Sequence, residues 1–270
     1  MIARARLKDI LELAGLLDAA REARGFAAGM PWWARNSALR RRGAGDGLPL
    51  PPLRLVRAAT GTSSLEWMLD GGRRAADSIT AVLEHNGVAI RRVRRILDFG
   101  CGCGRVVRCW RDLSGEVHGC DYNAAAIRWC RRHFPFATFA VNGLAPPLPY
   151  ADERFDLVYA LSVFTHLPEP LLGDWMREMA RVLVPGGLLV ASTHGSACLD
   201  ALDADEQAAF HAGQAVVKDE ASAGTNRCGV YVSMEYVRSR MARGFRVLDI
   251  VPEGAKGNPP QDLVLMQKPG

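Results

Sequence analysis

Residues 96–105 read Ile-Leu-Asp-Phe-Gly-Cys-Gly-Cys-Gly-Arg, and this stretch decides the fold. Apolar residues on both sides of Asp98 predict a buried strand that carries this acid near its end. Glycines then follow at alternate positions: Gly100, Gly102 and Gly104. The apolar spacing from Val106 to Trp110 predicts a helix directly after them. A strand that enters a helix through a glycine-rich turn lets a ligand approach bare backbone, so the stretch predicts a binding turn.

A second acid lies where the next strand is expected to end. Val117–Cys120 predict this strand, and Asp121 follows it 23 residues after Asp98. A carboxylate at the tip of the second strand of an open α/β sheet is well placed to bind ribose hydroxyls. The alternative for Asp121 is a helix N-cap, because Asn123 and the alanines after it predict a helix start. The alternative for Asp98 is an acid of the turn that contacts no ligand.

Strands and helices alternate through the rest of the chain. This alternation predicts a mostly parallel sheet with helices on both faces, and a ligand site beyond the carboxyl ends of the strands. Pro185 is expected to stop a helix, and Gly186 or Gly187 to take positive φ in the turn that leads into the fifth strand. The other strands are expected at Phe136–Val141, Phe155–Ala160, Phe245–Val251 and Asp262–Lys268.

These motifs resemble those of the class I S-adenosylmethionine-dependent methyltransferases. The resemblance rests on the acid and G-x-G-x-G at 98–104, on Phe-Asp-Leu-Val at 155–158 and on Leu-Val-Pro-Gly-Gly at 183–187. It covers roughly residues 94–193, and residues 234–268 more weakly. It implies a Rossmann-like, doubly wound sheet of seven mostly parallel strands, with the last strand antiparallel. It also implies methyl transfer from S-adenosyl-L-methionine, whereas a nicotinamide enzyme needs its third glycine one position later.

The resemblance further implies where the methyl donor binds. Its ammonium group is expected near Asp98 and the carbonyl groups of Ala160 and Leu161. Asn142 is expected at the edge of the adenine, with Tyr122 or Leu144 against the face of the ring. Many relatives carry Asp at this place, and the alternative for Asn142 is a residue that ends a strand. The expected donor-binding set is Asp98, Gly100, Cys101, Gly102, Arg105, Asp121, Tyr122, Asn142, Gly143, Leu144 and Leu161.

Two histidines are candidate general bases. His166 follows the fourth strand directly and His194 follows the fifth, so both are expected at the carboxyl edge of the sheet. A base helps methyl transfer only if the acceptor has a proton to lose. The alternative for each is a structural histidine that packs or caps a loop, and His211 is a weaker candidate.

The predicted catalytic domain is residues 53–270, with a core at 94–193, a lid-like insertion at 194–230 and a final helix and strands at 234–268. An N-terminal helical extension and a linker rich in glycine and proline precede it at 1–52, with an amphipathic helix from Leu7 to Leu17. Further helices are expected at 63–69, 73–85, 203–211 and 234–243, the first two separated by Gly71-Gly72. Trp67 and Tyr231 are the candidate acceptor-binding residues, together with Trp32 and Trp33, and core packing is the alternative.

Composition narrows the classes of partner. No apolar run approaches the ~18 residues that a membrane-spanning helix needs. The seven cysteines are scattered and odd in number, which favours a reducing cytoplasm, and Cys101-x-Cys103 lacks the further ligands of a zinc site, so no metal is expected. The net charge of +5 comes with arginine clusters that lack interleaved aromatics, which disfavours nucleic acid. Asn258-Pro259-Pro260-Gln261 is similar to a motif of amino-methylating enzymes, but it precedes the last strand and is interpreted as a loop.

The sequence therefore predicts a cytoplasmic methyltransferase that acts on oxygen or nitrogen of a small-molecule acceptor, such as a metabolite or natural product. Two alternatives stay open. One is a methyltransferase for RNA or protein, which would bind RNA in a salt-dependent way. The other is a methyltransferase-like protein that binds without turnover.

Overall fold

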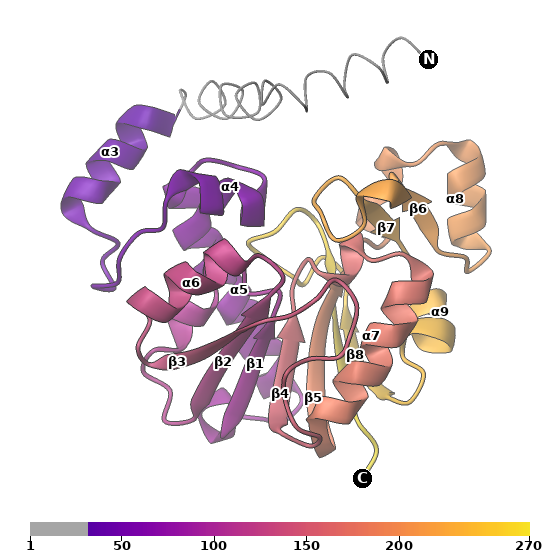
Figure 1. The fold of residues 1–270 in the computed structure, drawn as a ribbon. Coiled ribbons are helices and arrows are strands. Elements are labelled where there is room, and N and C mark those ends of the chain that lie inside the picture. The colour runs from indigo at the N-terminus through magenta and orange to yellow at the C-terminus, as the bar shows by residue number, and fades with distance from the viewer. Residues whose placement is uncertain (1–31) are drawn as a thin grey trace. The chain divides into compact units, whose positions relative to one another are not determined.

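The computed structural model describes residues 32–270 (Figure 1). The chain divides into two compact units after Met68. The helix predicted over residues 7–17 lies outside the described residues. The first unit holds α3 (Trp33–Arg42) and α4 (Leu53–Thr60), joined by a loop over the predicted linker. Asn36 of α3 is buried, and its amide donates to the carbonyl of Ser63 and accepts from the amide of Leu65. This side chain therefore ties α3 to the segment that follows α4.

The second unit, Leu69–Gly270, is built on one seven-stranded sheet. Neighbouring strands are parallel from β3 to β5 (Figure 1). Strand β9 is antiparallel to both of its neighbours, which confirms the predicted fold class. Every predicted strand bound quoted above lies within one residue of the observed one. The order across the sheet is β3 (Ala137–Val141), β2 (Glu116–Asp121), β1 (Arg95–Phe99), β4 (Phe155–Ala160), β5 (Leu183–Thr193), β9 (Asp262–Gln267) and β8 (Arg246–Val251).

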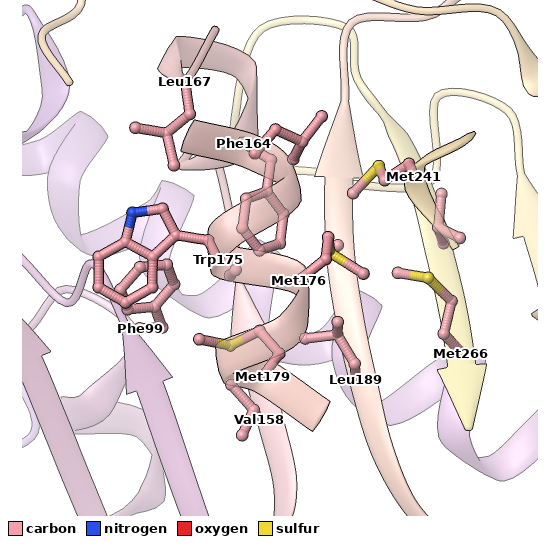
Figure 2. Close-up of a cluster of buried hydrophobic side chains, with 14 of the residues drawn as sticks. Phe99, Val158, Phe164, Leu167, Trp175, Met176, Met179, Leu189, Met241 and Met266 are labelled. Atoms are coloured by element: carbon pink, nitrogen blue, oxygen red, sulfur yellow. The ribbon is translucent and has the colours of Figure 1, made fainter. Parts of the chain in front are cut away.

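Helix α7 (Glu169–Val182) shows how sequence spacing builds the core. Its buried apolar residues recur at helical spacing, so they form one stripe that packs on the sheet. Figure 2 shows Trp175, Met176 and Met179 of this helix directed toward side chains of the strands. The rings of Trp175 and Phe99 lie 4.5 Å apart, and Phe99 is the last residue of β1 before the glycine turn. Full burial of a phenylalanine or methionine side chain contributes about 1.5–3 kcal/mol to the free energy of unfolding.

Helix α5 (Leu65–His85) is one continuous helix, so the prediction of two short helices is wrong. Gly71 and Gly72 lie inside it. A Cβ at Gly72 would clash with the carbonyl oxygen of Arg105, and one at Gly71 would lie 2.8 Å from the carbonyl oxygen of Gly257. These glycines therefore allow the helix to approach two loops closely, and they do not interrupt it.

The prediction of a regular helix from Val106 is also wrong, because only a short 3₁₀ helix, Val107–Trp110, forms there. Gly102 and Gly104 have φ of 52° and 76°, which turns the chain back before a regular helix can start. A Cβ at Gly104 would clash with the ring of Phe134, so the turn is held by packing as well.

The turn before the fifth strand forms as a bulge at the start of β5. Gly186 has φ of 76°, as predicted for this turn, and the register with β4 jumps from Leu183 to Leu188. Helix α6 (Ala124–His133) follows β2. The predicted last crossover helix forms as α9 (Met234–Tyr236) followed by a short π-helix at Val237–Met241.

The insertion after β5 forms a small subdomain of the second unit. Helix α8 (Ala204–His211) begins as predicted at Asp203, whose side chain caps it. A hairpin of β6 (Val216–Lys218) and β7 (Gly229–Tyr231) follows, which the sequence analysis did not predict. Further short 3₁₀ helices are Ile90–Arg92, Phe164–His166, Ser196–Ala201 and Glu220–Ser222. No helix within residues 32–270 combines the length and the apolar character that crossing a membrane requires.

Candidate active site

The glycine turn after β1 is joined to the end of β2 through Asp121. One carboxylate oxygen of Asp121 accepts from the amide of Gly102 at 2.8 Å, and the other accepts from the amide of Asn123 at 2.7 Å. The N-cap of α6 is Asn123, whose side chain accepts from the amides of Ala125 and Ala126. Asp121 is therefore not the helix cap. Its carboxylate retains further lone pairs that can accept hydrogen bonds from a ligand.

Asp98 lies on β1 beneath the same turn and is only 4% exposed. The hydroxyl of Tyr159 on β4 donates to it, and Trp110 donates to that hydroxyl at 3.0 Å. Burial raises the pKa of Asp98 to about 7, although this hydrogen bond and the charge of Arg105 oppose the rise. A cation placed beside Asp98 would restore its ionised form, because an opposite charge favours the carboxylate.

Arg105 leaves the glycine turn toward the β8–β9 loop, residues 252–261. Its guanidinium donates to the carbonyl oxygen of Gly257 at 3.3 Å and to the side-chain oxygen of Asn258. Burial lowers the pKa of Arg105, and the negative charge of Asp98 opposes this shift. The amide nitrogen of Asn258 is buried and has no hydrogen-bond partner among the described residues.

A second buried amide atom without a partner lies at the end of β3. The Nδ2 atom of Asn142 donates to the carbonyl of Gly143, whereas its Oδ1 has no partner within residues 32–270. Exposed apolar side chains gather around the ends of β2 and β3: Tyr122 is 50% exposed, Val141 41% and Leu144 42%. An acceptor atom beside apolar surfaces suits the edge and face of a purine.

The remaining candidates for donor contacts also lie at the carboxyl ends of β1 and β4. A Cβ at Gly100 would clash with Val163, so the glycine turn and the segment after β4 approach closely. Leu161 is buried in that segment. Cys101 is buried as well, and burial raises the pKa of its thiol, which keeps the thiol protonated at neutral pH.

His166 and His194 lie together, with ring centroids 6.1 Å apart. The insertion holds both of them in the same way. His166 donates from Nδ1 to the carbonyl of Cys228 at 2.6 Å, and His194 from Nδ1 to that of Val230 at 3.2 Å. Their own carbonyls accept from the amides of Gly224 and Val232. A carbonyl partner fixes the hydrogen on Nδ1 and leaves the lone pair on Nε2.

The two histidines differ at Nε2. The side-chain amide of Gln261 lies 3.3 Å from Nε2 of His194, whereas Nε2 of His166 has no hydrogen-bond partner within the described part of the chain. Burial lowers the pKa of both rings, that of His194 to about 4 with the charge of His166 contributing. Both imidazoles are therefore neutral at neutral pH, and His166 has the open lone pair.

The sequence analysis missed Gln261, which links three strands. Its side chain accepts from the hydroxyl of Ser192 at 2.8 Å and donates to that of Ser162 at 2.9 Å. Ser192 in turn accepts from the amide of Ser162, a residue held at φ of 57°. The network thus supports a strained turn directly after β4, next to Leu161 and ahead of His166.

The candidate acceptor residues fall into both units. The ring of Tyr231 lies 5.0 Å from that of His194, so the structure brings Tyr231 to the histidine pair. Trp67 belongs to the first unit and is 37% exposed, and Trp33, also in that unit, is 69% exposed. His211 is the last residue of α8.

Comparison with known proteins supports the assignment that this geometry indicates. Residues 97–191 match the family model described as a methyltransferase domain. These residues form a class I S-adenosylmethionine-dependent methyltransferase domain. This confirms the resemblance stated from the sequence motifs, including the methyl donor that the family uses.

Curated methyltransferase relatives match the same region. The chain is 36% identical over 121 residues to a malonyl-[acyl-carrier protein] O-methyltransferase of Enterobacter lignolyticus, which covers 45% of each chain. It is 34% identical over 101 residues to a ubiquinone biosynthesis O-methyltransferase of a Bradyrhizobium species, covering 37% of this chain and 39% of the relative. The matches thus span less than half the length of these relatives.

Solved methyltransferase structures share the fold. A methyltransferase from Methanosarcina mazei superposes with a TM-score of 0.52 at 22% identity, covering 69% of this chain and 97% of that one. A structure described as a sarcosine dimethylglycine methyltransferase from Galdieria sulphuraria gives 0.53 at 16% identity, covering 73% and 86%. At such identities the likeness supports the fold alone.

Proposed function

We propose that this protein transfers the methyl group of S-adenosylmethionine to an oxygen or nitrogen of a small-molecule acceptor. The observation that carries the proposal is the neutral His166, whose Nε2 is open directly after β4. In this proposal, residues 53–270 form the catalytic domain, residues 194–230 act as its lid, and residues 1–52 are an extension.

The side chains around the glycine turn fit the donor. Asp98 takes the ammonium group, whose charge favours the ionised form of this buried carboxyl. Asp121 accepts from the ribose hydroxyls, and the unpartnered Oδ1 of Asn142 accepts from the exocyclic amine of adenine. Tyr122 and Leu144 offer exposed apolar surface to the ring. When bound, the donor supplies a methyl group already activated on a sulfonium.

Methyl transfer in this proposal also requires that the acceptor is oriented toward the methyl group and that a base removes its proton. Holding two reactants in a near-attack geometry contributes up to ~7–11 kcal/mol in favourable cases. Nε2 of His166 takes the proton of a hydroxyl or amine as the new bond to the methyl group forms. His194, held by Gln261, positions the acceptor together with Tyr231.

The printed names of both curated relatives support oxygen as the methylated atom, since both are O-methyltransferases. One acts on malonyl-[acyl-carrier protein] and the other belongs to ubiquinone biosynthesis. A phenol, which has a proton for His166 to take, is therefore the first acceptor class to test. A carboxylic acid is the second, and because it is already ionised at neutral pH its methylation should not depend on His166.

The experiment is methyl transfer from isotope-labelled donor to panels of carboxylic acids, phenols and amines, with tRNA and protein extract as separate arms. His166→Gln serves as the matched control and should retain binding of S-adenosylhomocysteine. Label in a small molecule, lost in the control, supports the proposal. Label found only in RNA or protein overturns the small-molecule assignment, and absence of donor binding indicates a non-catalytic member of the family.

A further inference from the structure

Asn258 in the β8–β9 loop carries a buried hydrogen-bond donor that nothing in the described chain satisfies. The orientation of its amide is fixed, because the guanidinium of Arg105 can only donate and therefore faces Oδ1. Nδ2 is then the atom left over. A buried donor without a partner costs free energy unless a ligand or water accepts from it.

The loop is held firmly against the glycine turn. Gly257 has φ of 80°, and a Cβ there would clash with the carbonyl oxygen of Gly71 on α5. The carbonyl oxygen of Gly257 also accepts from Arg105. Since a Cβ at Gly72 would clash with the backbone of Arg105, all three segments are in close contact. Packing thus fixes the Asn258 amide next to Arg105.

The charges around the turn match those of an amino acid. Asp98 and Arg105 flank the glycines and lie close enough that each shifts the pKa of the other. The methionine end of the donor carries an ammonium and a carboxylate on one carbon. Asp98 complements the first group, which leaves the carboxylate to be neutralised. A guanidinium with a neighbouring N–H donor is a favourable partner for a carboxylate.

We propose that Asn258 and Arg105 bind the carboxylate of the methionine moiety, so that the β8–β9 loop contacts the methionine end of the donor. The inference rests on the proposed use of S-adenosylmethionine. It gives a ligand-binding role to a segment that the sequence analysis interpreted as a plain loop.

Decarboxylated S-adenosylmethionine, which lacks only this carboxylate, provides the test. Calorimetry on the full chain should show that Asn258→Ala weakens S-adenosylmethionine binding on the order of tenfold or more, the range for a hydrogen bond to a charged group. Binding of the decarboxylated compound should change less than about twofold. Asn258→Asp should weaken the first ligand further, because a carboxylate then faces a carboxylate.

A matched control lies at the far end of β9. The amide oxygen of Gln267 also accepts from an arginine, Arg246, but its nitrogen is satisfied by the carbonyl of Gly186. Gln267→Ala should leave the affinity for both ligands unchanged. Equal loss of both ligands in Asn258→Ala, or no loss of either, would overturn the carboxylate assignment. Failure of the wild-type chain to bind either ligand would instead refute the proposed donor.

Discussion

Nδ1 of His166 donates to the carbonyl oxygen of Cys228 at 2.6 Å, so a residue that follows β4 has its tautomer fixed by the segment just before β7. His194 repeats the pattern with Val230, two residues further along the same segment. One carbonyl partner, Cys228, directly precedes β7, and the other, Val230, lies within it. Because Gln261 lies against Nε2 of His194, the pair is asymmetric, and only His166 presents an open lone pair. This asymmetry favours His166 over His194 as the proposed base.

The first prediction follows from that asymmetry. His166→Ala should lower kcat by roughly 10²–10⁴ with S-adenosylhomocysteine binding intact, because the open base is lost. His194→Ala should act mainly on the KM of the acceptor, since its Nε2 is already engaged. Steady-state kinetics with an identified acceptor measure both. Wild-type turnover in His166→Ala would rule out the base role and leave catalysis to orientation alone.

The wild-type pH profile gives a second prediction. A general base works only when unprotonated, and burial lowers the pKa of His166 below its ordinary value of 6.5. The rate under saturating donor and acceptor should therefore fall to half of its plateau only at a pH below 6.5. An acid limb centred above pH 6.5 would contradict the burial of His166 in the working enzyme.

The third prediction links Asp98 to donor binding. Its pKa of about 7 in the free protein means that the carboxyl is mostly protonated at pH 6. A bound ammonium favours the ionised form, so binding should release a proton at pH 6. Affinity for S-adenosylhomocysteine should rise about tenfold per pH unit below 7 and level off above it.

Calorimetry in buffers of different ionisation enthalpy measures the released proton. Asp98→Asn should remove both the proton release and the pH dependence.

For the folding of the free protein, the raised pKa of Asp98 predicts that stability falls as the pH rises. The contribution of the protonated Asp98 to the free energy of unfolding is complete below pH 3.8 and is lost as the pH rises through 7. A stability that gains from ionisation of Asp98 would show that the site already holds a cation.

The fourth prediction concerns Asp121 and its neighbour Asn123. Asp121→Ala leaves the amides of Gly102 and Asn123 without acceptors, so it should lower the free energy of unfolding by about 1–3 kcal/mol. It should also weaken S-adenosylhomocysteine binding on the order of tenfold or more. Asn123→Ala, which removes only the α6 cap, should cost about 0.5–2 kcal/mol and leave binding unchanged. Identical behaviour of the two variants would contradict a ribose-binding role for Asp121.

The sequence predicted what depends on local pattern. Local pattern was enough to predict where the strands and the glycine turn lie. It also predicted that Asp98, Asp121 and the two histidines lie at or just after strand ends. Gln261 could not be placed this way, because its partners are 69 and 99 residues distant. They meet it only where antiparallel β9 starts beside the end of β5, the neighbour of β4. The β6–β7 hairpin has strands of three residues, too short to give a clear alternation.

The two glycines of α5 are a second case in which contacts with distant residues override the local pattern. Local propensity treats Gly71-Gly72 as a helix break, whereas the structure uses them for contact with Arg105 and Gly257. Local pattern cannot reveal that need, since the contacting residues lie in distant loops.

The fifth prediction turns this into a measurement. Alanine ordinarily stabilises a helix interior relative to glycine by about 0.5–1 kcal/mol. Gly173 of α7 has open space, with the nearest side-chain atom, Nη1 of Arg177, 3.8 Å from a Cβ built there, so Gly173→Ala should show this gain. Gly72→Ala should instead cost about 1–3 kcal/mol, because its Cβ would clash with the Arg105 backbone. Urea unfolding of the full chain compares the two variants. Because the clash must displace Arg105, Gly72→Ala should also weaken binding of S-adenosylhomocysteine, which Gly173→Ala should not. Equal stabilisation by both alanines would mean that α5 does not contact the glycine turn in solution.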